Sequence, residues 1–425
     1  MSSWTANISP RTPERFAAAE CAQSGYIRSQ SNSTSSQLFE SFNDIPAVWN
    51  EICHREDLAM DIKVLGVFQR TLVDQCRCWG MIVYDASGIA IGCAALCLFQ
   101  TEVIESKNPF LIRWRERLRC VFPRLGRMPV LFCGLPVPSG ASHLRVREGA
   151  SPDAVVTEID RAMQRLARSL GARLTVFKEL DEASPLISTL SYKGYIRGAV
   201  PPMHLLDVSF DSFAHYRDAL KSRYRSQVKR SQKKMVSAGF EVLHGRGHAF
   251  FAEHFDEHVH RLYMAVHGRA EQKLELMPAS FFREMATALE DEVLLTVIRR
   301  EGRICAFTFA ITRGRTHYNM YSGLDYTLNN EGDLYFNLFY HDMDQAFRAG
   351  ATSLHLGQTS DTFKSRLGMH AQKLWFFARA RPSLFNRLLH FFAPLVFPKV
   401  AEVEPNDVFA EMRGITAQTP NNRIR

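Results

Sequence analysis

The sequence predicts an α/β protein made of two copies of one mixed unit. Apolar strand-like runs alternate with stretches of helical periodicity, and the same order of elements occurs twice. In each copy a hairpin is followed by a helix, a glycine and a further strand. The chain has 425 residues, of which 46% are hydrophobic and 23% charged, and this composition suits a folded protein with room for two or three cores.

The first copy begins with the apolar runs 81–84 and 89–99, which are separated by the turn residues Asp85-Ala86-Ser87-Gly88. Apolar residues then recur at helical spacing from 159 to 170, and Gly171 and an extended run follow. This order predicts a hairpin, a helix that ends at the glycine, and a strand.

The second copy repeats this order. The apolar runs 293–298 and 304–312 flank a turn at 300–303. Apolar residues recur at helical spacing from 334 to 347, and Gly350 precedes another extended run. We therefore expect the two copies to form two similar units.

These patterns divide the chain into five parts. The first copy is the longer one, and the difference falls in an arginine-rich insertion at about 101–129. The expected parts are a flexible tail at 1–37, a first unit at 38–206 that contains the insertion, a second unit at 207–382, an apolar aromatic helix at 383–400 and a polar tail at 401–425.

The composition argues against several classes of protein. The longest apolar stretch, 88–99, is well short of the roughly 20 residues of a membrane-spanning helix. No secretory signal is recognisable, so we expect a cytoplasmic protein. The nine cysteines form an odd set, which favours free thiols. His254 and His258 fit a short zinc-protease pattern that arises by chance, and we expect no metal.

The net charge of +8 is concentrated in two segments. Residues 111–127 carry six arginines against one acid, and residues 221–234 carry seven basic residues and no acid. Such segments attract phosphates, whether of nucleic acid, nucleotide or lipid head group.

Several motifs in the second half resemble one family. They are the basic helix that begins Lys221-Ser222-Arg223-Tyr224-Arg225, the strand Gly239-Phe240-Glu241-Val242, Tyr321-Ser322-Gly323, the helix end Ala349-Gly350, the strand Leu354-His355-Leu356-Gly357, and Phe363-Lys364-Ser365-Arg366-Leu367-Gly368. In order and spacing they are similar to FemAB-like aminoacyltransferases and related GNAT acyltransferases. The likeness is clear over about 207–380 and weaker in the preceding half.

The resemblance implies two tandem GNAT-like domains, each a mixed central sheet flanked by helices. It implies transfer of an acyl or aminoacyl group to an amine, less readily to a hydroxyl, of a small-molecule, cell-envelope or lipid-linked acceptor. Acyl-CoA or aminoacyl-tRNA would be the co-substrate, with no tightly bound cofactor. The alternative is a non-catalytic module that binds nucleic acid or phosphate through residues 221–234.

Acyl transfer passes through a tetrahedral oxyanion, so the site needs a donor aimed at that oxygen and groups that carry protons. Lys364 matches the family's late lysine and is the first candidate; the alternative is a surface lysine. Tyr321, Asp325 and His317 lie on or just after the strand from 316 to 321 and are candidate acids or bases. They could equally be residues at the edge of the core.

Phosphate groups of a donor have a candidate site in the first unit. Arg145, Arg147 and Gly149 lead into Ser151, which is expected to cap a helix N-terminus. An ordinary capped helix with solvated arginines is the alternative. In the second unit the corresponding turn, 329–333, contains two acids and no basic residue, which disfavours a CoA site there.

The basic helix is the candidate surface for a phosphate-bearing partner such as tRNA. Arg223, Arg225, Lys229 and Arg230 are its expected contacts, with Tyr326 as a further substrate-binding candidate. A simply solvated helix is the alternative.

The aromatic stripe within 384–397 has basic residues on both sides and suits peripheral contact with the inner face of a membrane. A terminal helix that closes the second core is the alternative.

Overall fold

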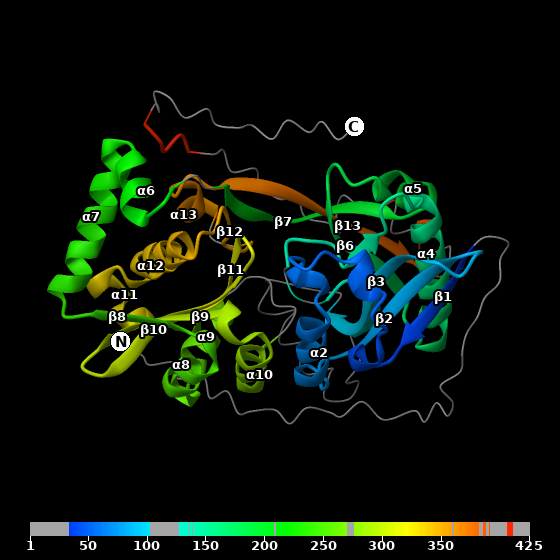
Figure 1. Ribbon diagram of the computed structural model, residues 1–425, viewed down its shortest axis with the longest axis horizontal. Helices are drawn as coiled ribbons and strands as arrows, with labels where there is room; N and C mark the ends of the chain where they lie inside the picture. The colour runs from blue at the N-terminus through cyan, green and yellow to red at the C-terminus, as the bar shows by residue number, and fades with distance from the viewer. Residues whose placement is uncertain are drawn as a thin grey trace.

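The computed structural model describes residues 34–102, 127–135, 137, 139–207, 210–269, 276–358, 361–381, 386–387, 391 and 406–410 (Figure 1). Most of the expected arginine-rich insertion, of the N-terminal tail and of the aromatic C-terminal helix lies outside these residues. The expected division of the chain between residues 206 and 207 stays a prediction.

Thirteen described strands form one mixed sheet in the order β1-β2-β3-β4-β6-β13-β7-β12-β11-β10-β9-β8, with β5 paired to β3. Their bounds are β1 Thr34–Phe39, β2 Cys76–Asp85, β3 Ala90–Glu102, β4 Arg127–Cys133, β5 Leu144–Val146, β6 Leu174–Asp181, β7 Ile196–Asp207, β8 Glu241–Arg246, β9 Val293–Arg300, β10 Arg303–Arg313, β11 Thr316–Leu324, β12 Ser353–His355 and β13 His370–Ala380.

The described helices cover both faces of this sheet (Figure 1). Their bounds are α1 Trp49–Ile52, α2 Ile62–Thr71, α4 Pro152–Ser169, α5 Leu186–Tyr192, α6 Phe213–Ala219, α7 Ser222–Ser237, α8 Gly247–His254, α9 Glu257–Arg269, α10 Ala279–Leu289, α11 Tyr326–Gly332, α12 Leu334–Arg348 and α13 Asp361–Ser365, with short 3-10 turns at Phe42–Asp44, Leu58–Met60 and Glu290–Glu292. None of the helices within the described ranges is both long and apolar enough to cross a membrane.

The two units have the same order of strands. In the first, the hairpin β2–β3 continues to β4, which pairs in parallel with β6. In the second, the hairpin β9–β10 continues to β11, which pairs in parallel with β12. The expected fold class, a mixed α/β chain of two GNAT-like units, is confirmed.

Each unit gives its last strand to the other. Strand β7 follows the first unit in the chain but pairs with β12 of the second, and β13 follows the second unit but pairs with β6 of the first. β7 and β13 also pair with each other, and Figure 1 shows them side by side across the middle of the molecule. A cut after residue 206 would therefore divide the sequence but not the hydrogen-bonded sheet.

Local sequence signals place the turns and helix ends. In the β9–β10 hairpin, Glu301 and Gly302 both have positive φ, 52° and 77°, as a two-residue turn of matching twist requires. Ser151 accepts a hydrogen bond from the Ala154 N–H, and Pro152 occupies the first turn of α4. Gly171, with φ of 69°, follows the end of that helix.

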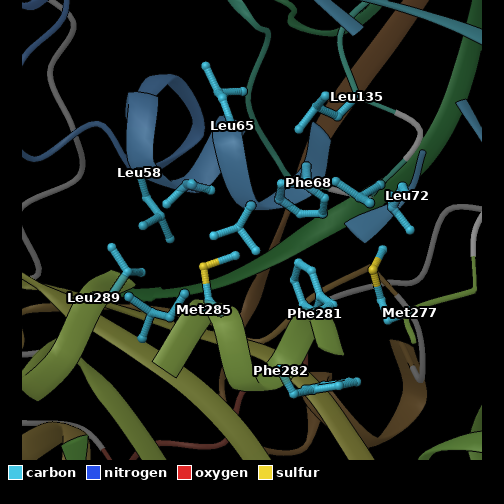
Figure 2. Close-up of a cluster of buried hydrophobic side chains, with 14 of the residues drawn as sticks. Leu58, Leu65, Phe68, Leu72, Leu135, Met277, Phe281, Phe282, Met285 and Leu289 are labelled. Atoms are coloured by element: carbon cyan, nitrogen blue, oxygen red, sulfur yellow. The ribbon is translucent and has the colours of Figure 1, made fainter. Parts of the chain in front are cut away.

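One hydrophobic core joins the two units, as Figure 2 shows. Helix α2 of the first unit packs against α10 of the second, and the rings of Phe68 and Phe281 lie 5.0 Å apart. Leu65, Met285 and Phe281 are fully buried. The relative position of the two units therefore depends on apolar packing as well as on the shared sheet.

Two segments extend the fold beyond the expected boundaries. Strand β1 begins at Thr34 and pairs with β2, although residues up to 37 were expected to belong to a flexible tail. Val408, in the expected polar tail, is buried, and its carbonyl accepts the Lys221 N–H at 2.8 Å. The sequence did not predict that these two segments are part of the fold, because the residues with which they pair are distant in the sequence.

Replacement of Phe281 by Ala tests the shared core. Because the ring is fully buried between the units, we expect a loss of about 3–5 kcal/mol in the free energy of unfolding. Urea unfolding, followed by circular dichroism, should show one transition at a lower midpoint. The exposed Val73, changed to Ala, is the control. Two separate transitions, of which only one moves, would contradict a common core.

Candidate functional site

A β-bulge lies where the first unit meets β13. The parallel pairing of β4 with β6 ends at Cys133 and Phe177. On β13, Phe377 pairs with Phe177 and Trp375 with Leu180, so two residues of β6 face one residue of β13. Such a bulge turns a side chain away from its regular direction, and bulges are frequent beside active sites.

Glu179 occupies this bulge in a strained conformation. Its φ is 58°, in the left-handed region that non-glycine residues rarely adopt, and the residue is 1% exposed. Its Oε2 accepts hydrogen bonds from the N–H and Oγ of Ser139, at 3.1 and 2.6 Å. Its Oε1 accepts one from Gln358 Nε2 at 2.9 Å. One carboxylate thus connects the loop after β4 to the loop after β12.

Lys364 of α13 lies beside the same loop. Its side chain is 2% exposed, and Nζ is 3.7 Å from the position that a Cβ on Gly357 would occupy. Gly357 has a φ of 78°, and its carbonyl accepts the N–H of His204 on β7 at 3.2 Å. A buried ammonium therefore lies at the junction of the two units. We call this region, defined by Ser139, Glu179, Gly357, Gln358 and Lys364, the junction site.

The first unit contributes a second buried ammonium and a histidine next to the junction site. Lys178 Nζ donates to the carbonyls of Leu135 and Val137, and lies 3.5 Å from Glu179 Oε1. His143 is fully buried, and burial lowers its pKa to about 3, with the charges of Lys178 and Arg145 adding to the effect. Its Nδ1 finds no hydrogen-bond partner among the described residues. This histidine stays neutral at physiological pH.

Among the four predicted catalytic residues, only Lys364 belongs to the junction site. His317 is fully buried beneath α12, where Nε2 lies 3.0 Å from Asp342 Oδ2 and Nδ1 2.9 Å from Thr312 Oγ1. Tyr321 lies on the other face of β11, in an aromatic cluster with Phe281. The structure therefore separates these two side chains by the thickness of the sheet.

Asp325 has a structural role at a helix end. It is the N-cap of α11, where Oδ1 accepts from the N–H of Thr327 at 3.0 Å and from its Oγ1 at 2.6 Å. Burial acts to raise its pKa, but the hydrogen bonds from Thr327 and the nearby charges outweigh it and lower the pKa. Tyr326, the next residue, has the Arg269 guanidinium 3.6 Å from its ring centroid.

The predicted phosphate-binding arginines are paired with acids. Arg145 makes two hydrogen bonds to the carboxylate of Asp57, at 2.5 and 3.1 Å, and Arg147 pairs with Glu51. Ser151 uses its hydroxyl to cap α4. Gly149 is exposed with a φ of 80°.

In the second unit, residues of the corresponding turn, 329–333, accept hydrogen bonds from the start of α12. Asn329 Oδ1 accepts the N–H of Tyr335 at 2.9 Å, and the carbonyl of Asp333 accepts the N–H groups of Phe336 and Asn337. The N–H groups of Tyr335, Phe336 and Asn337 are therefore used within the protein.

The basic helix docks through one stripe and exposes its charges. Its buried residues are Tyr224, Val228, Ser231 and Met235. Of the predicted contacts, Arg223, Lys229 and Arg230 are exposed, and Arg225 donates to the carbonyls of Asp218 and Leu220. Tyr224 and Val228 of this stripe share a core with Phe363 of α13, the residue that precedes Lys364.

One cluster in the part of the chain that the structure describes has the composition of a metal site. The sulfur atoms of Cys76, Cys78 and Cys97 lie within 4.8 Å of one another, and all three residues are buried. Hydrogen bonds from Cys78 and Cys97 lower the pKa of Cys76 to about 5. The cluster lies in the core under β2 and β3, away from Lys364. His254 and His258 belong to different helices, α8 and α9.

Five residues at or next to the junction site were not predicted from the sequence: Ser139, His143, Lys178, Glu179 and Gln358. One signal was present. Lys178 and Glu179 interrupt an apolar strand with two adjacent charges, and a charge at a buried strand position requires a partner. The other three come from loops, where spacing says nothing about direction.

The sequence matches the model of the FemAB-like family, described as peptidoglycan biosynthesis/recognition, over residues 127–396. This match covers more than half of the chain and includes both sides of the junction site. The chain belongs to the FemAB-like family. No curated protein matches the chain.

Solved structures that are similar to this FemAB-like chain have low sequence identity to it. A tandem GNAT protein from the clavulanic acid biosynthesis pathway is 13% identical with a TM-score of 0.49, and 82% of this chain and 99% of that one are covered. FemX is 12% identical (TM-score 0.47; 76% and 93% covered). L-PGS from Bacillus licheniformis is 12% identical (TM-score 0.44; 79% and 92% covered).

The neutral, buried His143 predicts a pH dependence of stability. Its folded pKa of about 3 is below the ordinary value of 6.5, so between these values the unfolded chain binds a proton that the folded chain does not. The contribution of His143 to the free energy of unfolding is complete above pH 6.5. It is lost as the pH falls toward 3, by up to ~1.4 kcal/mol per pH unit.

Urea unfolding of the wild type and of His143→Gln at several pH values between 7 and 4 measures this contribution. The variant should gain stability relative to the wild type as the pH falls. The exposed His54, changed to Gln, is the control. A difference between wild type and His143→Gln that does not change with pH would contradict the assignment.

Proposed function

We propose that this FemAB-like chain transfers an acyl or aminoacyl group to an acceptor amine at the junction site. The observation that carries the proposal is the buried ammonium of Lys364 beside Gly357, at the place where the two units exchange strands. An ammonium held at a buried position acts strongly on negative charge that develops or binds beside it, such as an oxyanion or a donor phosphate.

Lys364 would act as the electrostatic stabiliser of the reaction. The acceptor nitrogen attacks the carbonyl carbon, the new C–N bond forms, and negative charge collects on the carbonyl oxygen. The bond to the donor oxygen or sulfur then breaks, and the proton lost by the amine leaves with the donor. An ammonium held in a site with little water stabilises the intermediate far more than it would in solution.

Glu179 would be a positioning residue. Its carboxylate holds the Gln358 side chain and the loop that contains Ser139, and Gln358 directly follows Gly357. Gly357 lies next to Lys364 Nζ. The hydrogen bond between Glu179 and Gln358 therefore limits the movement of the backbone beside this ammonium.

An aminoacyl group carried on tRNA is the donor that the described residues favour. The groups that could bind the pyrophosphate of CoA are engaged within the protein, since Arg145 and Arg147 pair with acids and three N–H groups in the first turn of α12 bond to Asn329 and Asp333. Lys229 and Arg230 on α7 remain exposed for a polyphosphate partner. The family description supports a cell-envelope precursor as acceptor.

Replacement of Lys364 by Met tests the catalytic role, because Met has a similar length and suits a buried position. We expect kcat to fall by about 10²-fold or more while the protein stays folded. Turnover would be measured with radiolabelled donor and hydroxylamine as a small amine acceptor. The exposed Lys233, changed to Met, is the control. A Lys364→Met variant with unchanged turnover would exclude this role.

A comparison of two donors tests the preference for tRNA. With aminoacyl-tRNA, the triple change Lys229→Gln, Arg230→Gln and Lys233→Gln should lower kcat/KM by about tenfold or more and weaken its salt dependence. With acetyl-CoA the same change should have no effect. Efficient transfer from acetyl-CoA and none from tRNA would reject the donor assignment and leave the proposed role of Lys364 standing. Retention of bound RNA by an inactive wild type would favour a binding module instead.

A further inference from the structure

Several arginines gather at the edge of the first unit where β6 begins and β13 ends. The N–H of Arg381, just after β13, donates to the carbonyl of Arg173, just before β6, at 2.7 Å. Arg168 is exposed at the end of α4. Arg387 is exposed on the helical turn that follows β13. We call Arg168, Arg173, Arg381 and Arg387 the arginine edge.

Within the part of the chain that the structure describes, these charges have no acidic partner. No described carboxylate forms an ion pair with any of the four. The nearby Asp160 is buried and already pairs with Arg379 and Lys193. The pKa of the Arg381 guanidinium is lowered, first by partial burial and then by the positive charges of Arg168 and Arg379. Like charges held together in this way repel each other until an anion binds.

The segments that lead away from the arginine edge carry two exposed aromatic residues. The side chain of Tyr192, at the end of α5, is 94% exposed, and that of Phe391 is 78% exposed. Asn386 joins their segments to the edge, because its Oδ1 accepts the Ala380 N–H at 2.9 Å and its Nδ2 donates to the Gly194 carbonyl at 3.0 Å. Exposed aromatic side chains next to basic ones suit the boundary between lipid head groups and acyl chains.

We propose that the arginine edge, with Tyr192 and Phe391, docks the protein on the surface of an anionic lipid bilayer. Basic side chains bind the lipid head groups, and aromatic side chains enter the interface between head groups and acyl chains. Two aromatic rings on different segments can both enter the head-group region of a bilayer, which suits them better than a nucleic acid backbone. The basic helix α7 belongs to the other unit, so the two charged surfaces are separate (Figure 1).

The fold also relates this edge to the junction site. Strand β6 runs from Arg173 at the arginine edge to Glu179 at the junction site, a distance of about 20 Å at the rise of a β-strand. If the function proposed above is correct, the acceptor amine lies about this far from the bilayer surface. That distance suits a lipid-linked precursor with a long polar head group and not the amine of a phospholipid head group.

Co-sedimentation of the full chain with vesicles tests docking without any assumption about catalysis. We expect binding to vesicles that contain phosphatidylglycerol and little binding to phosphatidylcholine alone, with loss of binding at high salt. The double change Arg173→Glu and Arg381→Glu should lower the fraction bound to anionic vesicles by at least about tenfold. The matched control, Lys229→Glu and Lys233→Glu on α7, should not.

A second pair of changes, Tyr192→Ser and Phe391→Ser, removes the rings and leaves the charges. This variant should bind anionic vesicles less tightly at every salt concentration. Circular dichroism confirms that each variant is folded. Equal binding of both vesicle types, or loss of binding only in the α7 variant, would overturn the proposal. So would an Arg173→Glu/Arg381→Glu variant that loses affinity for a single-stranded RNA but keeps its affinity for vesicles.

The turnover assay with hydroxylamine separates this inference from the proposed function. Docking variants should keep wild-type turnover with this soluble acceptor, because none of the changed residues belongs to the junction site. If the wild type binds anionic vesicles and transfers no acyl group, the proposed function fails and the docking surface stands. If it transfers but does not bind vesicles, the docking surface fails.

Discussion

The exchange of β7 and β13 between the two units is the constraint on which the rest of the structure depends. Each unit alone would end its sheet at the parallel pair β4–β6 or β11–β12, with an unpaired edge. The exchanged strands cover both edges and make one continuous sheet. The ends of the two parallel pairs therefore face each other, and residues 178–179 of one unit meet residues 357–358 of the other.

Polar bonds across this junction support a strained backbone. A glutamate in the left-handed region costs of order 1–3 kcal/mol, and at position 179 the strain is offset by three hydrogen bonds from Ser139 and Gln358. Strain of this kind persists only where the surroundings require it. Here the surroundings are the two loops that contain Ser139 and Gln358, and the shared core between α2 and α10 keeps the units in place.

The sequence predicted the repeat well and the site only in part. Turns at Gly88 and Gly302 and helix ends at Gly171 and Gly350 are local properties, readable from residue type. Lys364 was chosen from its motif; the structure buries it beside Gly357, and its catalytic role stays a prediction. Tyr321, Asp325 and His317 occupy a similar stretch of chain but point to an aromatic cluster, a helix cap and a buried carboxylate. Direction across a strand and choice of hydrogen-bond partner depend on neighbours that are distant in the sequence.

The sequence by itself determined the fold class, the two copies of one unit, the basic face of α7 and the position of the late lysine, because periodicity, glycine and charge act over a few residues. Only the tertiary structure decided which strands are exchanged, that Arg145 and Arg147 are already paired, that Glu179 and Gln358 meet beside Lys364, and that arginines from three separate segments share one edge. Several of these contacts join residues that are more than a hundred positions apart in the sequence. They form because the edge strands of the sheet need hydrogen-bond partners and buried charges need partners of opposite charge or polar groups.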